Sequence, residues 1–318
     1  MIKQKAIGFL INQKMFIILI VLVLFLSLYT EFFLTFENII NIIFQIALNG
    51  IIAIGMTYLI ISGELDLSVG SSVAFTGVVT VMLLRSELGL LPSILIGMLT
   101  GVLIGFVNGV LVIKVKINSI ATTLGMMIFL RGLVYLLTGN KNIRGTSETF
   151  KLIGSGEIFN IPYVVIIFIF LILVFGFLLA NTIYGRNIYA IGGNSQASRL
   201  FGINVGKNKL IAFIITGFLA SVSGIILASR LNVGSTQVGV DTLIDVLTIV
   251  ILGGASLAGG EGSMFRTFQA ALLIGIISNA LQFLNIISHY HPIIKGLLLL
   301  GVLIIDAWYV KYRKYRFV

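Results

Sequence analysis

The sequence lacks the residues on which most metal and disulfide chemistry depends: its 318 residues include no cysteine and only two histidines. Without cysteine there is no disulfide framework, no thiol nucleophile and no thiolate metal ligand. The histidines, His289 and His291, flank a predicted helix end, and no metal site is expected. Neither an HExxH nor a GxSxG motif occurs, so no catalytic residues are expected and an intramembrane hydrolase has no support.

Charge is also scarce, because 10% of the residues are charged and 58% are hydrophobic. A soluble globular domain is usually about half apolar and about one quarter charged. The chain therefore has too few ionised side chains to cover a surface in water, which indicates that lipid surrounds much of it. A β-barrel would show short segments of alternating polarity, and no such alternation persists here. The composition predicts an all-α polytopic membrane protein.

Apolar stretches recur along the chain at roughly the length that a helix needs to cross a bilayer, which is about 20 residues. They lie at 15–34, 40–61, 69–84, 92–113, 118–138, 162–181, 210–230, 243–258, 264–285 and 292–310. We expect about ten transmembrane helices in a single domain over residues 1–318, with the first stretch retained as a helix. The third and eighth stretches are short and glycine-flanked, so either could be a half-helix or a re-entrant segment.

Basic residues predict the topology of these helices, in a chain whose net charge is +10. If the N-terminus is cytoplasmic, the inside segments hold most of the lysines and arginines, as the positive-inside rule requires. The outside segments hold only Arg85, Lys141, Arg144, Lys151 and Arg230. An even helix count then places both termini in the cytoplasm, in a multi-pass protein of the cell (inner or cytoplasmic) membrane. Because topology explains the basic residues, no nucleic-acid partner is expected.

Two long loops separate these stretches. The outside loop, 139–161, is polar and long enough to fold over a pore mouth. In the inside loop, 181–209, Asn194 offers a helix N-cap and Gly202 is well placed to end the helix. We therefore predict a short helix from Ser195 to Phe201, suited to meeting a partner in the cytoplasm. The alternative is a helix that lies along the membrane interface.

The fourth stretch has glycines at every fourth position, which lie on one face of a helix and let a neighbouring backbone approach closely. These are Gly97, Gly101, Gly105 and Gly109. We interpret them as packing residues.

Polar residues inside the apolar stretches could line a pathway for a hydroxylated solute, or could equally tie helices together. They are Gln45, Asn49, Asn108, Thr122, Thr123, Asn279 and Gln282. Asp245 joins them as a pathway candidate, because a charge at membrane depth is a functional suspect by default. Arg131 is a reasonable partner for Asp245, and Lys295 is the third deep charge.

Two further carboxylates, Glu64 and Asp66, fall at a predicted cytoplasmic boundary, where water solvates them at little cost. We expect Asp66, together with Ser68, to cap the following helix.

A phosphate-binding loop of the form GxxxxGK[ST] is missing. Residues 202–207, GINVGK, are one residue short of it and are followed by Asn208. The chain cannot be its own ATPase, and no cofactor is expected to bind to it.

Several motifs resemble one family of membrane proteins. They are GMTYLIISGELDLSVGS at 55–71, IATTLGMMIFLRGLVYLLTG at 120–139, GRNIYAIGGNSQASRLFGINVGKNKL at 185–210, ILGGASLAGGEGSMFRTFQAALLIGIISNALQFL at 251–284 and IIKGLLLLGVLIID at 293–306. Together they resemble the permease subunits of bacterial ABC importers for ribose, galactose, xylose and the sugar-like autoinducer, which are relatives of the branched-chain amino-acid permeases.

This resemblance implies a role for the inside loop as the element that couples the permease to a cytoplasmic ABC ATPase. The coupling residues would be Gly192, Gly193, Asn194, Ala197, Leu200, Gly202 and Ile203. It also implies an extracytoplasmic sugar-binding protein, a second permease copy (identical or paired), and ATP with Mg²⁺ on the ATPase. The expected function is import of a small sugar such as ribose.

The sequence departs from the family pattern at some positions, including Glu64, Asn118-Ser119, Leu243, Ser278 and Ala280. These departures concern the substrate more than the transport role, so a nucleoside, the autoinducer or a branched-chain amino acid stays open as the solute. A protein of another class, an ion-coupled secondary transporter, is the alternative. It would need an acidic residue at membrane depth, and Asp245 is a candidate.

Overall fold

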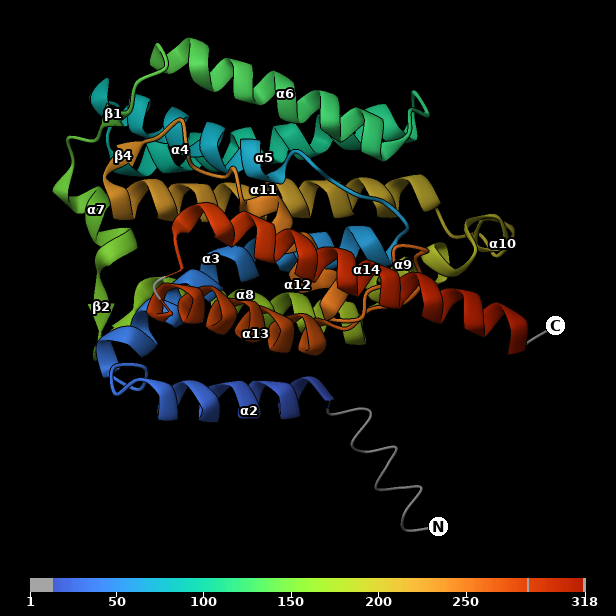
Figure 1. Ribbon diagram of the computed structural model, residues 1–318. Helices are drawn as coiled ribbons and strands as arrows, with labels where there is room; N and C mark the ends of the chain where they lie inside the picture. Colours follow the sequence, from blue (N-terminus) through green and yellow to red (C-terminus); the bar gives the residue numbers. More distant parts are fainter. Residues whose placement is uncertain (1–13, 285, 317–318) are drawn as a thin grey trace.

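The structure, a computed structural model, describes residues 14–284 and 286–316. Helices form nearly all of its regular structure, as Figure 1 shows. They are α2 (Lys14–Tyr29), α3 (Phe36–Ile61), α4 (Val69–Arg85), α5 (Leu90–Ile113), α6 (Ser119–Thr138), α7 (Glu148–Ser155), α8 (Tyr163–Asn181), α9 (Ile183–Gly193), α10 (Ser195–Leu200), α11 (Val205–Leu231), α12 (Thr242–Leu252), α13 (Met264–Phe283), the 3₁₀ turn η1 (Ser288–Tyr290) and α14 (His291–Arg316).

Each of the ten predicted apolar stretches contains a helix, so the prediction of an all-α chain is confirmed. Six of these helices, α3, α5, α6, α8, α11 and α13, are long and apolar enough to cross a membrane. The apolar parts of α2, α4, α12 and α14 are shorter, between 10 and 17 residues. The described chain therefore shows a multi-pass protein with six clear spans, and the count of ten stays a prediction.

Several predicted boundaries were wrong. A side-chain cap explains one of them, and a glycine backbone angle explains another. The helix α11 begins at Val205 rather than near residue 210, because the Asn204 side chain accepts a hydrogen bond from the Lys207 amide. The helix α12 ends at Leu252 rather than near residue 258, since Gly254 adopts a φ of +79° that breaks the helix.

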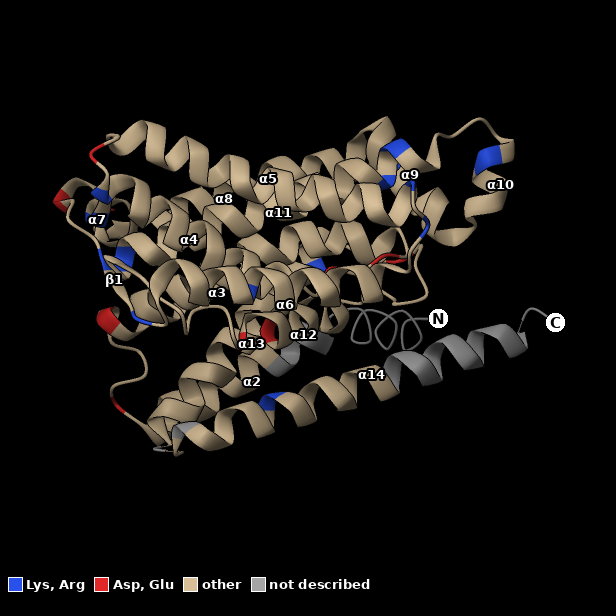
Figure 2. Ribbon diagram, turned by 90° about the horizontal axis from the view of Figure 1, so that it is seen from above, with Lys and Arg blue, Asp and Glu red and all other residues tan. Residues whose placement is uncertain are grey.

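The bundle has two distinct ends, which Figure 1 shows on the left and on the right. The α7 end also carries the small strand pairs. In them β1 (Ile143–Arg144) runs antiparallel to β4 (Val233–Gly234), and β2 (Glu157–Ile158) pairs with β3 (Ile161–Pro162). The α10 end carries α9, α10 and the end of α14. Figure 2 shows that the charged residues gather mainly at these two ends.

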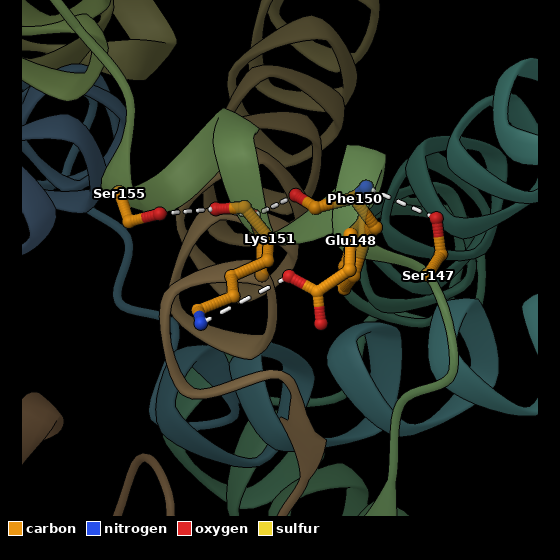
Figure 3. A network of polar contacts seen from close by, with 6 residues as sticks. Ser147, Glu148, Phe150, Lys151 and Ser155 are labelled. Carbon is orange, nitrogen blue, oxygen red and sulfur yellow. Dashed lines mark hydrogen bonds and ion pairs between the residues drawn. The ribbon is translucent and has the colours of Figure 1, made fainter.

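The predicted loop 139–161 is partly helical, because α7 forms within it and packs on the end of α11. Figure 3 shows its internal contacts: the Ser147 hydroxyl accepts a hydrogen bond from the Phe150 amide, 3.1 Å away, and thereby caps the helix. Lys151 and Glu148 form an exposed ion pair at 4.0 Å. The Ser229 hydroxyl of α11 accepts from the Gly154 amide at 2.7 Å and donates to the Phe150 carbonyl.

The glycine face of α5 lies against α11, and there is no room for side chains between the two helices. A Cβ atom on Gly101 would overlap the Gly217 carbonyl, and one on Gly105 would overlap the Phe213 carbonyl. Gly97 and Gly109, at the two ends of the same face, meet Thr80 and Leu210. All four glycines are buried, and backbone-to-backbone contact of this kind is the usual use of such spacing.

This contact predicts that Gly101→Ala lowers the free energy of unfolding by about 1–3 kcal/mol, because the added methyl group must displace the backbone of α11. Gly125→Ala, on the exposed face of α6 where nothing lies within 4 Å, is the matched control and should cause no loss. Thermal unfolding of the purified protein in detergent measures both. Equal stability of the two variants would refute the packing role.

Candidate functional site

The helix α4 begins inside the bundle rather than at its end. After α3 ends at Ile61, residues 62–68 turn back along the start of α6. There the Leu65 amide donates to the Ser119 hydroxyl at 3.4 Å and the Leu67 amide donates to the Thr123 hydroxyl at 3.0 Å. These contacts give the irregular backbone hydrogen-bond partners inside the protein, which a segment at membrane depth requires.

The helix α12 also begins inside the bundle, after a segment that descends from the α7 end (Figure 1). The backbone of Gly239 touches that of Gly70 in the first turn of α4. Gly70 lies 15 residues before Arg85, which is about 22 Å at 1.5 Å per residue. Residues 235–241, which precede the predicted eighth stretch at 243–258, therefore bring irregular backbone into the bundle, and we call them the re-entrant segment.

Arg131, within α6, holds this segment in place. Its guanidinium donates to the carbonyl oxygens of Thr236, at 2.8 Å, and Val238, at 3.1 Å. The predicted pairing of Arg131 with Asp245 is therefore wrong. The backbone carbonyls of a re-entrant segment need a donor, and sequence alone does not show that such a segment passes Arg131.

A polar cavity of about 340 Å³ opens where these broken helices meet α3, α11, α13 and α14. This volume is at the lower end of the range for small-molecule sites. Its polar lining consists of Gln45, Asn49, Ser223, Gln237, Asp241, Thr242, Asp245, Ser278, Gln282, His291 and Lys295. Amides, hydroxyls and carboxylates of this kind can bind a hydroxylated solute through paired hydrogen bonds.

An ion pair crosses one wall of the cavity. The Lys295 ammonium on α14 lies 2.9 Å from each carboxylate oxygen of Asp245 on α12. The Asn49 amide, about midway along α3, donates to the same carboxylate at 3.0 Å. Asp245 is 7% exposed, and its place in the first turn of α12 adds the favourable end of the helix dipole. This contact neutralises two charges at membrane depth and joins three helices.

The other predicted pathway residues do not line this cavity. Asn279 and Asn38 exchange side-chain hydrogen bonds, at 2.7 and 3.2 Å, which tie α13 to α3. Thr123 accepts from the 62–68 segment, and Thr122 beside it is buried. Asn108 donates to the Ser68 hydroxyl at 3.0 Å. The structure thus places Gln45, Asn49, Asp245 and Gln282 at the cavity, and buries the other four among neighbouring helices.

Sequence reasoning missed most of the cavity lining, namely Ser223, Gln237, Asp241, Thr242, Ser278 and His291. One available signal was helical spacing, because Gln45–Asn49 and Ser278–Gln282 are each four residues apart in an apolar helix and so share a face. The residues of the re-entrant segment carry no such signal.

The expectation that water solvates Glu64 and Asp66 was also wrong. Asp66 is 2% exposed, and its carboxylate accepts from the Ser68 amide at 2.8 Å and from the Asn108 side chain at 3.3 Å. The carboxylate thus binds the residue that precedes α4, and it does not cap the amides of the first turn. Glu64 forms an ion pair with Lys209 of α11 at 2.5 Å. Both acids are inside because residues 62–68 turn back into the bundle.

The predicted short helix is confirmed as α10. The Asn194 side chain accepts from the Gln196 and Ala197 amides, at 3.0 and 2.9 Å, and Gly202 follows the helix with a φ of +80°. Figures 1 and 2 show α10 projecting beyond the bundle rather than lying along its side. Leu200 and Phe201, at its end, are 89% and 86% exposed.

The helix α9, which precedes α10, was not predicted. Its residues Tyr184 and Tyr189 are half-buried, and burial raises the pKa of both phenols. They therefore stay protonated near neutral pH, and each donates a hydrogen bond to a backbone carbonyl, Tyr184 to Asn208 and Tyr189 to Gly262.

A multi-pass helical bundle with a polar cavity between two broken helices is characteristic of membrane transport proteins. The comparisons agree with this class. The family described as "branched-chain amino acid transport system / permease component" matches residues 38–305. The chain belongs to this permease family, and the family resemblance read from the motifs is confirmed.

Curated relatives cover nearly the whole chain. The ribose import permease protein RbsC of Haemophilus influenzae is 38% identical, over 94% of each chain. The protein of the same name from Escherichia coli K12 is 37% identical, again over 94% of each. The L-arabinose transport system permease protein AraH of E. coli K12 is 35% identical over 94% of this chain and 92% of its own. The comparison with solved structures gave no match.

The ion pair at the cavity yields a stability prediction. Lys295→Met leaves Asp245 buried without its cation, which should lower the free energy of unfolding by about 3 kcal/mol, whereas adding Asp245→Asn should restore part of the loss. Lys151→Met, at the exposed pair in Figure 3, is the control and should change stability by less than about 1 kcal/mol. Thermal unfolding in detergent tests this; a double variant no more stable than Lys295→Met would contradict it.

Proposed function

We propose that this chain is the membrane-spanning permease subunit of an ATP-driven importer for a neutral monosaccharide such as ribose. The observation that carries the proposal is a polar cavity at membrane depth in a member of this permease family. Relatives named as ribose and arabinose permeases, 35–38% identical, support the substrate class.

The chemistry of the cavity favours a neutral solute over an amino acid. A zwitterion needs a cation for its carboxylate, and Lys295, the ammonium group in the cavity lining, is already paired with Asp245. The amides and hydroxyls that remain, Gln45, Gln282 and Ser278, are suited to sugar hydroxyls. This favours a sugar over a branched-chain amino acid.

The proposed topology has ten spans, with α4 and α12 as half-helices that complete their crossings through irregular segments. The end of α14 lies at the α10 end of the bundle (Figure 1). The distribution of basic residues in the sequence favours that end as the cytoplasmic one. The α7 end would then receive the soluble sugar-binding protein outside the cytoplasmic membrane.

The proposed motor is a separate ABC ATPase, which binds ATP and Mg²⁺, since this sequence has no phosphate-binding loop. The helix α10 projects from the cytoplasmic end and exposes Leu200 and Phe201. Apolar side chains that project into water at a helix end are suited to a pocket on a partner. We assign the ATPase contact to this helix, with no enzymatic activity in the permease itself.

A second permease copy follows from the exposure of the re-entrant segment. Gln237, Val240 and Asp241 are exposed, although Gly239 lies deep in the bundle beside Gly70. Irregular backbone at membrane depth cannot face lipid, and is tolerated only where protein covers it or where it lines a water-filled space. We therefore propose that this face is turned toward a second copy, with the solute pathway between the two.

Reconstitution tests this function. We expect liposomes that contain the permease, its ATPase and its sugar-binding protein to take up radiolabelled ribose only when ATP is present, with ribose-stimulated ATP hydrolysis. A panel of arabinose, xylose, a nucleoside and leucine defines the substrate. Uptake driven by a proton or sodium gradient without the ATPase would overturn the proposal in favour of a secondary transporter.

A second prediction concerns the ATPase contact. Replacing both Leu200 and Phe201 by serine removes two apolar anchors, so affinity for the ATPase should fall at least about tenfold, because burying one such side chain contributes roughly 1.5–3 kcal/mol. Leu152→Ser, an exposed leucine on α7 at the other end, is the control. Copurification at graded ATPase concentrations measures the affinity, and undiminished binding by the double variant would place the contact elsewhere.

A further inference from the structure

Three chain segments meet backbone to backbone at the α10 end of the bundle. The contributing residues are Gly63 after α3, Gly192 in the last turn of α9, and Gly259 and Gly260 in the loop after α12. We call these four residues the glycine junction. A hydrogen bond from the Gly260 amide to the Ile61 carbonyl, 2.8 Å long, lies within it. The junction therefore joins the ends of α3 and α9 to the loop between α12 and α13.

The junction leaves no space for a side chain at Gly192. A Cβ atom there would overlap the Ile61 carbonyl oxygen and the Gly260 amide nitrogen, both of which are backbone atoms that cannot rotate away. Gly259 and Gly260 have φ angles of +85° and +78°, a region that glycine occupies without strain. Gly193, the next residue, is different, because nothing lies within 4 Å of the Cβ position there.

Two tyrosines strengthen the link between α9 and the same two segments. The Tyr189 hydroxyl donates to the Gly262 carbonyl, at 3.0 Å, in the loop after α12. The Tyr184 ring stacks on the Tyr58 ring of α3, with centroids 5.8 Å apart and planes 19° apart. The helix α9 is thus held to α3 and to the loop between α12 and α13 by backbone contact, by a hydrogen bond and by ring stacking.

The contact of α9 with α3 and with the loop after α12 lies between α10 and the cavity. Only Asn194 separates α9 from α10: its amide donates to the Ala190 carbonyl of α9, and its side chain caps α10. On the other side, α3 carries Asn49, about 18 Å from Ile61 along the helix, and α12 carries Asp245. These two residues share a hydrogen bond in the cavity wall.

We propose that the glycine junction transmits a displacement of α10 to the cavity, with Gly192 as the positioning residue that makes the contact rigid. The inference rests on the proposed function, in which the ATPase moves α10. Packed backbones without intervening side chains are poorly compressible, so a shift of α9 moves the end of α3 and the loop between α12 and α13 together. The wall formed by Asn49 and Asp245 then changes shape when the ATPase closes.

The experiment compares Gly192→Ala with Gly125→Ala, a glycine of α6 with nothing within 4 Å of the Cβ position, in liposomes that contain the permease, its ATPase and its sugar-binding protein. The readout is ribose taken up per ATP hydrolysed. Misfolding lowers uptake and hydrolysis together and leaves this ratio unchanged, whereas loss of transmission lowers the ratio. We expect Gly192→Ala to lower it at least about tenfold, because the added methyl group forces the two backbones apart. Gly125→Ala should match the wild type.

Tyr189→Phe is a second, milder variant, which decides the question if Gly192→Ala does not assemble. It removes the hydrogen bond to Gly262 without a change of shape, and we expect the ratio to fall about fivefold, the effect of one hydrogen bond. If Gly192→Ala assembles and has the wild-type ratio, the proposal is overturned. If it does not assemble, a wild-type ratio for Tyr189→Phe overturns the proposal. A wild-type complex without ATP-dependent uptake would instead overturn the proposed function, so the two failures are distinguishable.

Discussion

The constraint on which this structure depends is that backbone polar groups at membrane depth must find partners within the protein. Two helices, α4 and α12, begin inside the bundle, and each is preceded by irregular backbone. Ser119 and Thr123 accept hydrogen bonds from one segment, and Arg131 donates to the carbonyls of the other. The cavity lies beside the segment that precedes α12, and polar side chains of α3, α12, α13 and α14 complete its lining.

Close backbone packing gives the bundle its shape around these breaks. Glycines bring α5 against α11, α4 against the re-entrant segment, and α9 against the end of α3 and the loop between α12 and α13. Such contacts fix the distance between helices without flexible side chains in between. They suit a protein whose parts move as rigid bodies, and in our proposals they connect the cytoplasmic helix α10 to the solute pathway.

The sequence predicted features with a local cause and missed those that arise from tertiary contacts. Apolar length located ten helices, and the Asn194 cap with Gly202 located α10. The partner of Asp245 could not be predicted, because Lys295 is 50 residues away and only the approach of α12 and α14 brings the two together. Asp66 looked solvated because a turn back into the bundle leaves no local sequence signal.

The central claim is that the cavity at the broken helices is an aqueous pathway within the membrane. Because the chain has no cysteine, a single introduced cysteine can be followed with a charged, membrane-impermeant thiol reagent. Thr242→Cys lines the cavity, and Leu103→Cys lies on the exposed apolar face of α5. The account predicts that Thr242→Cys reacts rapidly and that ribose with the binding protein slows it. Reaction no faster than that of Leu103→Cys would contradict the account.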